Sequence, residues 1–270
     1  MCDCWRKYNG ALIPLQPPNV PVKDNHEVIF SLIKKQNAYF ARWVSDFDCK
    51  DKKEFWYIVN NKNMYLDDYS SNTRNQIKKG LKNFNIEKIS HKLYYQQLYE
   101  IYCDVIKNYN SDFLFKDIND FISNISDSCE FWGVFYKDKL IGYSQNRVSH
   151  NFCDYSTIKI SKKYTKMYAN YALIYEMNRY YLKDRKINYV SDGARSILHD
   201  SKIQEFLVKK FKFRKAYCHL HIIYSTPVRF IIFVLFPFRF LIFKLNYFSL
   251  FKKIIAILKQ EEIFQLQKSE

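Results

Sequence analysis

The apolar and polar positions along this chain alternate between helical and strand periods. Apolar side chains recur every three or four residues in the helical stretches, whereas aromatic and β-branched side chains crowd the strand stretches. No proline lies between Pro21 and Pro227, so regular structure is expected to run through the middle of the chain. The expected helices cover residues 26–36, 71–82, 93–109, 117–125, 168–182 and 202–210, and the expected strands cover 40–47, 54–59, 86–89, 130–136, 140–148, 154–161, 186–190 and 215–224.

The order of these elements predicts a mixed α/β (α+β) sheet with helices on its faces. Lys137-Asp138-Lys139 reads as a tight hairpin turn. The stretch 168–182 is apolar nearly all round, so it should be a buried helix inside a right-handed strand–helix–strand crossover. The expected organisation is an N-terminal arm and partial α/β extension over 1–92, one domain over 93–225, and an apolar basic helical tail over 226–270.

The two ends of the chain differ from the middle. Residues 1–24 contain four prolines and predict an extended arm. In the tail, Arg239 and Lys244 interrupt the apolar runs and Pro237 should break a helix, so no membrane-spanning helix is expected. Aromatic groups spaced by cations suit an anionic membrane surface. The alternative is a pair of helices that pack on the domain or on a second subunit.

The formal net charge of +16 limits the partners without naming one. It fits nucleic acid, an anionic membrane surface or a phosphorylated substrate, and it also fits general solubility in a chain with biased composition. The seven cysteines form no CxxC pair, so neither a zinc site nor another metal site is expected. Scattered cysteines and the polar first residues favour a reduced, cytoplasmic protein.

Two turns at the carboxyl ends of predicted strands carry candidate chemistry. The turn over 161–166 holds Lys163 and Lys166 before the buried helix, whose N-terminus favours an anion; it reads equally well as a solvated basic loop. The second turn holds Asp192 and Arg195 and continues to His199. A carboxylate and a guanidinium there would orient an amine and stabilise an oxyanion, or would simply brace the turn.

A third candidate is the basic face of the helix over 71–82. Arg74, Lys78 and Lys82 recur at every fourth position and therefore share one side of the helix. Such a face can bind phosphates of tRNA, CoA or a lipid-linked precursor. An ordinary solvated helix face has the same pattern.

The element order resembles the GNAT acyltransferase fold, in which backbone amides of an Arg/Gln-x-x-Gly-x-Gly/Ala turn bind the pyrophosphate of acyl-CoA. In this chain Thr165, Tyr168 and Asn170 occupy the three motif positions, and none of them matches the motif. The resemblance implies a cofactor-binding turn that includes Lys163, Thr165, Lys166, Tyr168 and Asn170, with acyl-CoA as the donor. The candidate catalytic residues, from their place at the second turn, are Asp192, Arg195 and His199.

Three stretches resemble the FemABX-like peptidyltransferases, a subgroup that lacks the pyrophosphate turn and uses aminoacyl-tRNA. Residues 71–82 resemble a basic helix of that subgroup, and residues 172–177 resemble a helix that ends in Glu-Met. Asp192-Gly193, with Gln204-Glu205-Phe206 and Phe211-Lys212-Phe213, resembles its Asp-Phe-Gly-Gly turn and the stretch after it. The resemblance covers roughly residues 70–225 and implies aminoacyl transfer to a lipid-linked precursor.

These observations favour an acyltransferase that acts on a small-molecule or lipid-linked amine, in the cytoplasm or peripherally on the inner face of the membrane. The donor is expected to be acyl-CoA or aminoacyl-tRNA. The main alternative is a non-catalytic binding module that has kept the fold and lost the pyrophosphate loop. A nucleic-acid-binding protein is a third reading, which rests on charge alone.

Overall fold

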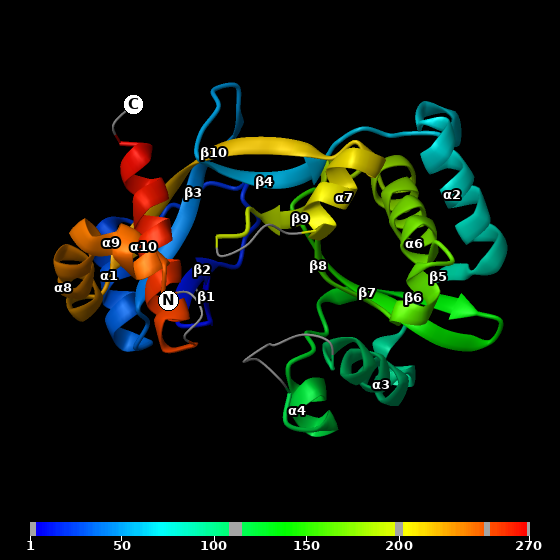
Figure 1. The fold of residues 1–270 in the computed structure, drawn as a ribbon, viewed down its shortest axis with the longest axis horizontal. Helices are drawn as coiled ribbons and strands as arrows, with labels where there is room; N and C mark the ends of the chain where they lie inside the picture. The colour runs from blue at the N-terminus through cyan, green and yellow to red at the C-terminus, as the bar shows by residue number, and fades with distance from the viewer. Residues whose placement is uncertain (1–3, 108–114, 198–201, 246–248, 269–270) are drawn as a thin grey trace. The chain divides into compact units, whose positions relative to one another are not determined.

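The computed structural model describes residues 4–107, 115–197, 202–245 and 249–268, so His199 lies outside the described residues. The chain forms two compact units (Figure 1). Unit 1 comprises Met1–Ile58, Ala194–Lys202 and Lys215–Glu270, and unit 2 comprises Val59–Gly193 and Ile203–Arg214. The boundaries expected at 92/93 and 225/226 remain predictions, although one strand pair in each unit, β3–β10 and β5–β6, forms across the first of them.

Unit 1 is a sheet with helices on both faces. Its strand order is β1-β2-β3-β10-β4, in which β2 and β3 are parallel while β1–β2 and β3–β10 are antiparallel. Ile29 and Ile33 of α1 pack on one face, and Ile263 of α10 packs on the other. The elements are β1 (Trp5–Tyr8), β2 (Ala11–Pro14), α1 (His26–Lys35), β3 (Phe40–Cys49), β4 (Phe55–Asn60, as far as Ile58), β10 (Arg214–Tyr224, from Lys215) and α10 (Ser249–Leu266).

The N-terminal arm contains a β-hairpin that the sequence prediction missed. β1 and β2 pair through a turn at Asn9 and Gly10, whose φ angles are 50° and 80°. Two consecutive left-handed residues are what a tight hairpin turn requires, and Asn-Gly supplies them at little cost. The prolines led to the prediction of an extended arm, whereas the Asn9-Gly10 pair is the sequence pattern that indicates a hairpin.

Unit 2 is a second mixed sheet with the strand order β9-β8-β7-β6-β5. β8 and β9 are parallel, and the other pairs are antiparallel. Figure 1 shows α3 and α4 on one face of the sheet and α2 and α6 on the other. The elements are α2 (Ser71–Asn83), β5 (Asn85–Ile89), α3 (Tyr95–Ile106), α4 (Ile118–Ser123), β6 (Cys129–Tyr136), β7 (Lys139–Ser149), β8 (Phe152–Ile160), α5 (Lys162–Thr165), α6 (Ala169–Asn178), β9 (Tyr189–Ala194, as far as Gly193) and α7 (Lys202–Phe211, from Ile203).

Alternation along β6 explains why both faces of unit 2 are covered. Phe131 and Phe135 point into a core with Leu98 and Phe121 of α3 and α4. Trp132, which lies between them in sequence, donates from Nε1 to the Tyr181 hydroxyl at 3.0 Å on the opposite face. Successive side chains of a strand point to opposite faces, so an aromatic-rich strand fills two cores at once.

The crossover is present as predicted, but two of its boundaries were wrong. The buried helix is α-helical only from Ala169 to Asn178 and continues as a π-helical turn, Arg179–Asp184. The strand expected at 186–190 instead runs from Tyr189 to Ala194. Ser191-Asp192-Gly193 therefore lies inside the strand and not in a turn beyond it. The π-helical turn carries the helical path two residues beyond its predicted end at 182, and residues 186–188, which were predicted as strand, precede β9.

The C-terminal tail also differs from the expectation. α8 (Thr226–Leu235), a 3₁₀ turn (Phe236–Phe238) and α9 (Arg239–Phe243) form one continuous helical path through Pro237. Within the described residues, Thr226–Phe243 is one helical stretch long and apolar enough to cross a membrane by length and composition. The expectation that no such stretch exists was wrong, because proline is tolerated where the helix tightens into a 3₁₀ turn.

Candidate active site

The pairing of β8 and β9 in unit 2 ends before the carboxyl ends of the two strands. The two parallel strands pair only from Phe152–Tyr189 to Asp154–Ser191, although β8 continues to Ile160 and β9 to Ala194. Parallel strands that part at their carboxyl ends leave room for a ligand between them. The expected site and the observed separation therefore fall at the same edge of the sheet.

Asp192 follows directly after the last paired residue of β9. Burial, together with the nearby Asp154 carboxylate, raises the pKa of Asp192 to about 7, while a hydrogen bond with Gln204 opposes the shift. The Gln204 side-chain amide also donates to the Asp192 carbonyl at 3.3 Å. A carboxyl group that titrates near neutral pH can act as a general base under physiological conditions.

The backbone around Asp192 is shaped by Gly193. Its φ is +82°, in the left-handed region that favours glycine, and its N–H donates to the Ser191 hydroxyl at 2.9 Å. A Cβ at Gly193 would lie 4.0 Å from Oδ1 of Asp154, so the Asp154 side chain reaches toward the Gly193 backbone. Asp154 itself accepts from the Ser156 hydroxyl at 2.9 Å. Both carboxylates are thus fixed at one level of the separating strands.

The predicted cofactor turn lies at the end of β8, before α6. Lys163 and Lys166 are exposed, and the Thr165 hydroxyl donates to the Lys162 carbonyl at 2.8 Å. Tyr168 stands at the N-cap with a left-handed φ of 69°, and Oδ1 of Asn170 is buried without a hydrogen-bond partner. The turn follows β8 and Asp192 follows the paired part of β9, so both lie at the carboxyl ends of these parallel strands.

The basic helix α2 packs against the first turn of α6. A Cβ on Gly80 would lie 2.5 Å from the Tyr168 carbonyl oxygen, which explains why glycine occupies this position. The Lys79 ammonium lies 6.0 Å from the Tyr168 ring centroid. Among the predicted anion-binding residues, Lys78 and Lys82 are exposed, whereas Arg74 forms an ion pair with Asp67 at 3.0 Å.

Arg195 belongs to unit 1 and is engaged there. Its backbone N–H donates to the Trp56 carbonyl at 2.9 Å, and its guanidinium forms an ion pair with Glu54 at 3.4 Å. The guanidinium carbon lies 5.5 Å from the Trp56 ring centroid. The catalytic roles assigned to Arg195 and His199 therefore remain predictions.

Aromatic side chains fill the space between α6 and α7 in unit 2. The Tyr171 ring centroid lies 4.9 Å from that of Phe206 and 5.8 Å from that of Phe211. Tyr69 adds a ring contact to Phe211 at 5.7 Å. Tyr171 and Phe211 are buried, so these rings form a packed cluster and not the wall of an open channel.

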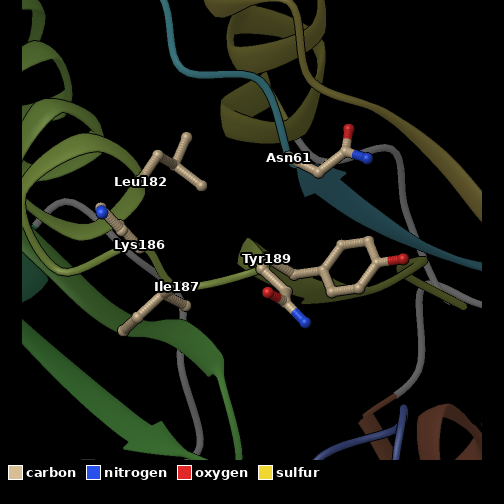
Figure 2. Close-up of a pocket in the computed structure, with 6 residues that line it drawn as sticks. Asn61, Leu182, Lys186, Ile187 and Tyr189 are labelled. Atoms are coloured by element: carbon tan, nitrogen blue, oxygen red, sulfur yellow. The ribbon is translucent and has the colours of Figure 1, made fainter.

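Figure 2 shows a pocket of about 380 Å³ at another place in unit 2. It lies at the amino end of β9, where the chain leaves the π-helical turn. The pocket and Asp192 therefore lie at opposite ends of β9. Its lining residues are Asn61, Leu182, Lys186, Ile187, Asn188 and Tyr189.

Two residues of this region were missed by sequence reasoning. Asp154 was read only as the start of a strand, although its carboxylate contributes to the raised pKa of Asp192. Lys159 lies farther along β8, and burial lowers its pKa. Asp154 pairs with Ser191, next to Asp192, and no local sequence pattern marks this register of two parallel strands. Within the described residues, no group of three or more His, Cys, Asp or Glu side chains is placed to hold a metal ion.

Comparisons with known proteins give structural neighbours only. No protein-family model matches the sequence, and no curated protein sequence matches it. The L-PGS structure from Bacillus licheniformis superposes with a TM-score of 0.51 at 11% identity, covering 84% of this chain and 82% of that one. The C-terminal domain of a putative lysylphosphatidylglycerol synthetase from Agrobacterium fabrum gives a TM-score of 0.50 at 8% identity, covering 81% and 78%.

A crystal structure of FemX gives a TM-score of 0.47 at 10% identity, covering 73% of this chain and 68% of that one. That likeness is too weak to place the chain in the FemABX-like subgroup. The two neighbours with higher scores share the fold without close sequence similarity, and such a likeness establishes architecture alone. The chain has a mixed α/β, GNAT-like fold.

Proposed function

We propose that this protein is an acyltransferase that uses Asp192 as the general base. The observation that carries the proposal is a carboxyl group with a pKa of about 7 at the point where β8 and β9 part. In this fold that point is the natural place for a reacting carbonyl. A base whose pKa lies near the working pH is ionised in a large fraction of molecules and still binds a proton strongly enough to accept it from the amine.

The proposed reaction is attack of an amine on an activated acyl group. The amine nitrogen forms a bond to the acyl carbon, and the bond from that carbon to the sulfur or oxygen of the donor breaks. The ionised Asp192 carboxylate accepts the proton that the amine loses, and the departing thiolate or alkoxide is then protonated. Asp154 contributes a second negative charge beside the base, which favours an incoming ammonium group over a neutral molecule.

The donor in this proposal is acyl-CoA or aminoacyl-tRNA. Both carry phosphates, and the exposed Lys163 and Lys166 stand at the turn before α6. The exposed Lys78 and Lys82 of α2 add charge, and α2 packs on the first turn of α6. The FemABX-like stretches favour aminoacyl-tRNA, because none of the pyrophosphate-motif positions carries the expected residue.

The acceptor in this proposal is an amine, either on a small molecule or on a lipid-linked cell-envelope precursor. One structural neighbour is named a putative lysylphosphatidylglycerol synthetase, and that name supports a lipid-borne acceptor. We propose on the same grounds that the protein is cytoplasmic and peripheral on the inner face of the membrane. The net charge of +16 is in keeping with an anionic surface.

A transfer assay with labelled acetyl-CoA or aminoacyl-tRNA and amine acceptors tests the proposal. Asp192→Asn should lower kcat/KM by about 10²–10⁴-fold, because general-base catalysis contributes that much. In the wild type, kcat/KM should rise with pH up to about 7 and then level off, since the carboxylate must be ionised. Asp138→Asn, at an exposed hairpin turn, should leave both the rate and the profile unchanged. Equal rates for the two variants would remove Asp192 from the mechanism.

A non-catalytic binding module is the second candidate, and the aromatic cluster favours it. Tyr171, Phe206 and Phe211 occupy space between α6 and α7 that a donor could otherwise reach. A module would bind a ligand without turnover. Equilibrium binding of acyl-CoA or tRNA with no detectable product for any acceptor, and equal affinity for wild type and Asp192→Asn, would support this candidate over the enzyme.

A further inference from the structure

The helical path formed by α8, the 3₁₀ turn and α9 has two apolar faces. Val228 and Ile232 are buried on one side, where α8 and α9 pack beside α10 (Figure 1). Phe230, Phe233 and Leu241 are 68%, 79% and 64% exposed. At 3.6 residues per turn, Phe230 and Phe233 of α8 fall on the side opposite Val228 and Ile232.

The exposed face is continuous and lacks acidic residues. Its members share large apolar side chains that contact solvent across the whole path; they are Phe230, Ile231, Phe233, Val234, Phe238, Phe240 and Leu241. Soluble proteins rarely leave a connected apolar surface of this kind uncovered. The exposed cations Arg229 and Lys244 stand at its two ends.

We infer that this face docks in the plane of an anionic lipid membrane. The partner is argued from charge and chemistry together: aromatic and aliphatic groups enter the acyl-chain boundary, and the flanking cations meet anionic headgroups. The net charge of +16 would repel a second copy of this chain but would attract such a surface. The inference deepens the location given in the proposed function, and its test needs no transferase activity.

The helical path lies on the membrane and does not cross it. Arg239 sits in its middle and is tied to Glu262 of α10 by an ion pair at 3.0 Å. Its guanidinium also stacks over the Phe236 and Phe240 rings, each at 4.3 Å to the centroid. A spanning orientation would pull Val228, Ile232 and Arg239 away from α10 and leave Glu262 without its partner.

Flotation of the full chain with vesicles of phosphatidylcholine and phosphatidylglycerol (70:30) tests the inference. Wild type should float with these vesicles, less so with pure phosphatidylcholine and less so at high salt. The triple variant Phe230→Ser/Phe233→Ser/Leu241→Ser should lower the bound fraction at least tenfold. Leu93→Ser, which removes an equally exposed apolar side chain in unit 2, should float like wild type.

Folding and competing partners are controlled in the same experiment. Thermal melting should show that the triple variant folds like wild type; if it does not, Arg229→Gln/Lys244→Gln replaces it and should lower binding to the anionic vesicles alone. Unchanged flotation of the folded variants overturns the inference, as does resistance of the wild type to carbonate extraction, which indicates a spanning helix. A concentration-dependent dimer that the triple variant abolishes, without vesicle binding, would assign the face to a second copy.

Discussion

Asp192 combines two properties: it is partly buried, and it lies beside another carboxylate. Each property disfavours the ionised form, so the folded protein holds a proton that the unfolded chain would release. The unfolded pKa of an aspartate is about 3.9. Between that value and about 7 the native state binds more protons than the unfolded state, and stability must fall as pH rises through this range.

Asp192→Asn should therefore stabilise the protein more at pH 8 than at pH 5. The amide cannot ionise, so it escapes the energetic cost that the buried carboxylate meets above pH 7. The relative gain should be about 1 kcal/mol or more, which corresponds to roughly 2–4 °C in Tm. Differential scanning fluorimetry at the two pH values measures it. Asp138→Asn serves as the control, and a gain for Asp192→Asn that is equal at both pH values would show that the carboxyl is not perturbed.

At this scale the sequence indicated some of the candidate residues and not others. Asp192 and Gly193 stood out because an acidic residue before a glycine follows a predicted strand, and Gly193 has a φ of +82°. Asp154 could not be found, because its relation to Asp192 depends on the register of β8 and β9, which no local pattern encodes. The ion pairs of Arg74 and Arg195 could not be predicted from the sequence either, because their partners depend on tertiary packing.

At the scale of elements, the close contact between α2 and α6 restricts position 80 to glycine. The helix contact brings the Gly80 backbone so close to the Tyr168 carbonyl that no side chain fits. This contact fixes α2 against the turn proposed to bind the donor. The glycine is thus kept by packing, although glycine is a poor residue inside a helix.

Gly80→Ala should destabilise the protein by about 1–3 kcal/mol, because the added Cβ meets a backbone oxygen that cannot rotate away. In a helix without this contact the same change would stabilise by roughly 1 kcal/mol, so the sign alone is informative. Urea unfolding measures the effect. Lys78→Ala, exposed on the same helix, should change stability by less than about 0.5 kcal/mol. A stabilising Gly80→Ala would contradict the close crossing.

Most elements were predictable because hydrophobic period and capping agree locally. Ser70 caps α2 by accepting from the Thr73 N–H. The errors share one cause: a local sequence pattern was interpreted without the surrounding sequence and the packing that the fold supplies. The Asn9-Gly10 turn was missed because the prolines of the same arm indicated an extended chain. The π-helical turn after Asn178 depends on the side chains that pack around Tyr181. The helical path through Pro237 depends likewise on packing against α10.

At the scale of the whole molecule, the GNAT-like architecture was predictable from the order of elements, whereas the compact units were not. Unit 1 draws strands from the first and last parts of the chain, since β3 pairs with β10. Pairings of such long sequence separation leave no periodic trace. The helices of the tail also differ in how they pack. α10 contributes Leu258 and Ile263 to the buried core, whereas α8 and α9 expose their outer face.

The central claim is that the donor binds where β8 and β9 part. Hydrogen–deuterium exchange of the full chain, with and without acetyl-CoA or a non-hydrolysable aminoacyl-tRNA analogue, tests it most directly. Protection should appear over residues 161–170 and 191–193 with at least one of the two donors. Protection confined to residues 182–189, which line the pocket of Figure 2, or no protection with either donor, would contradict the claim.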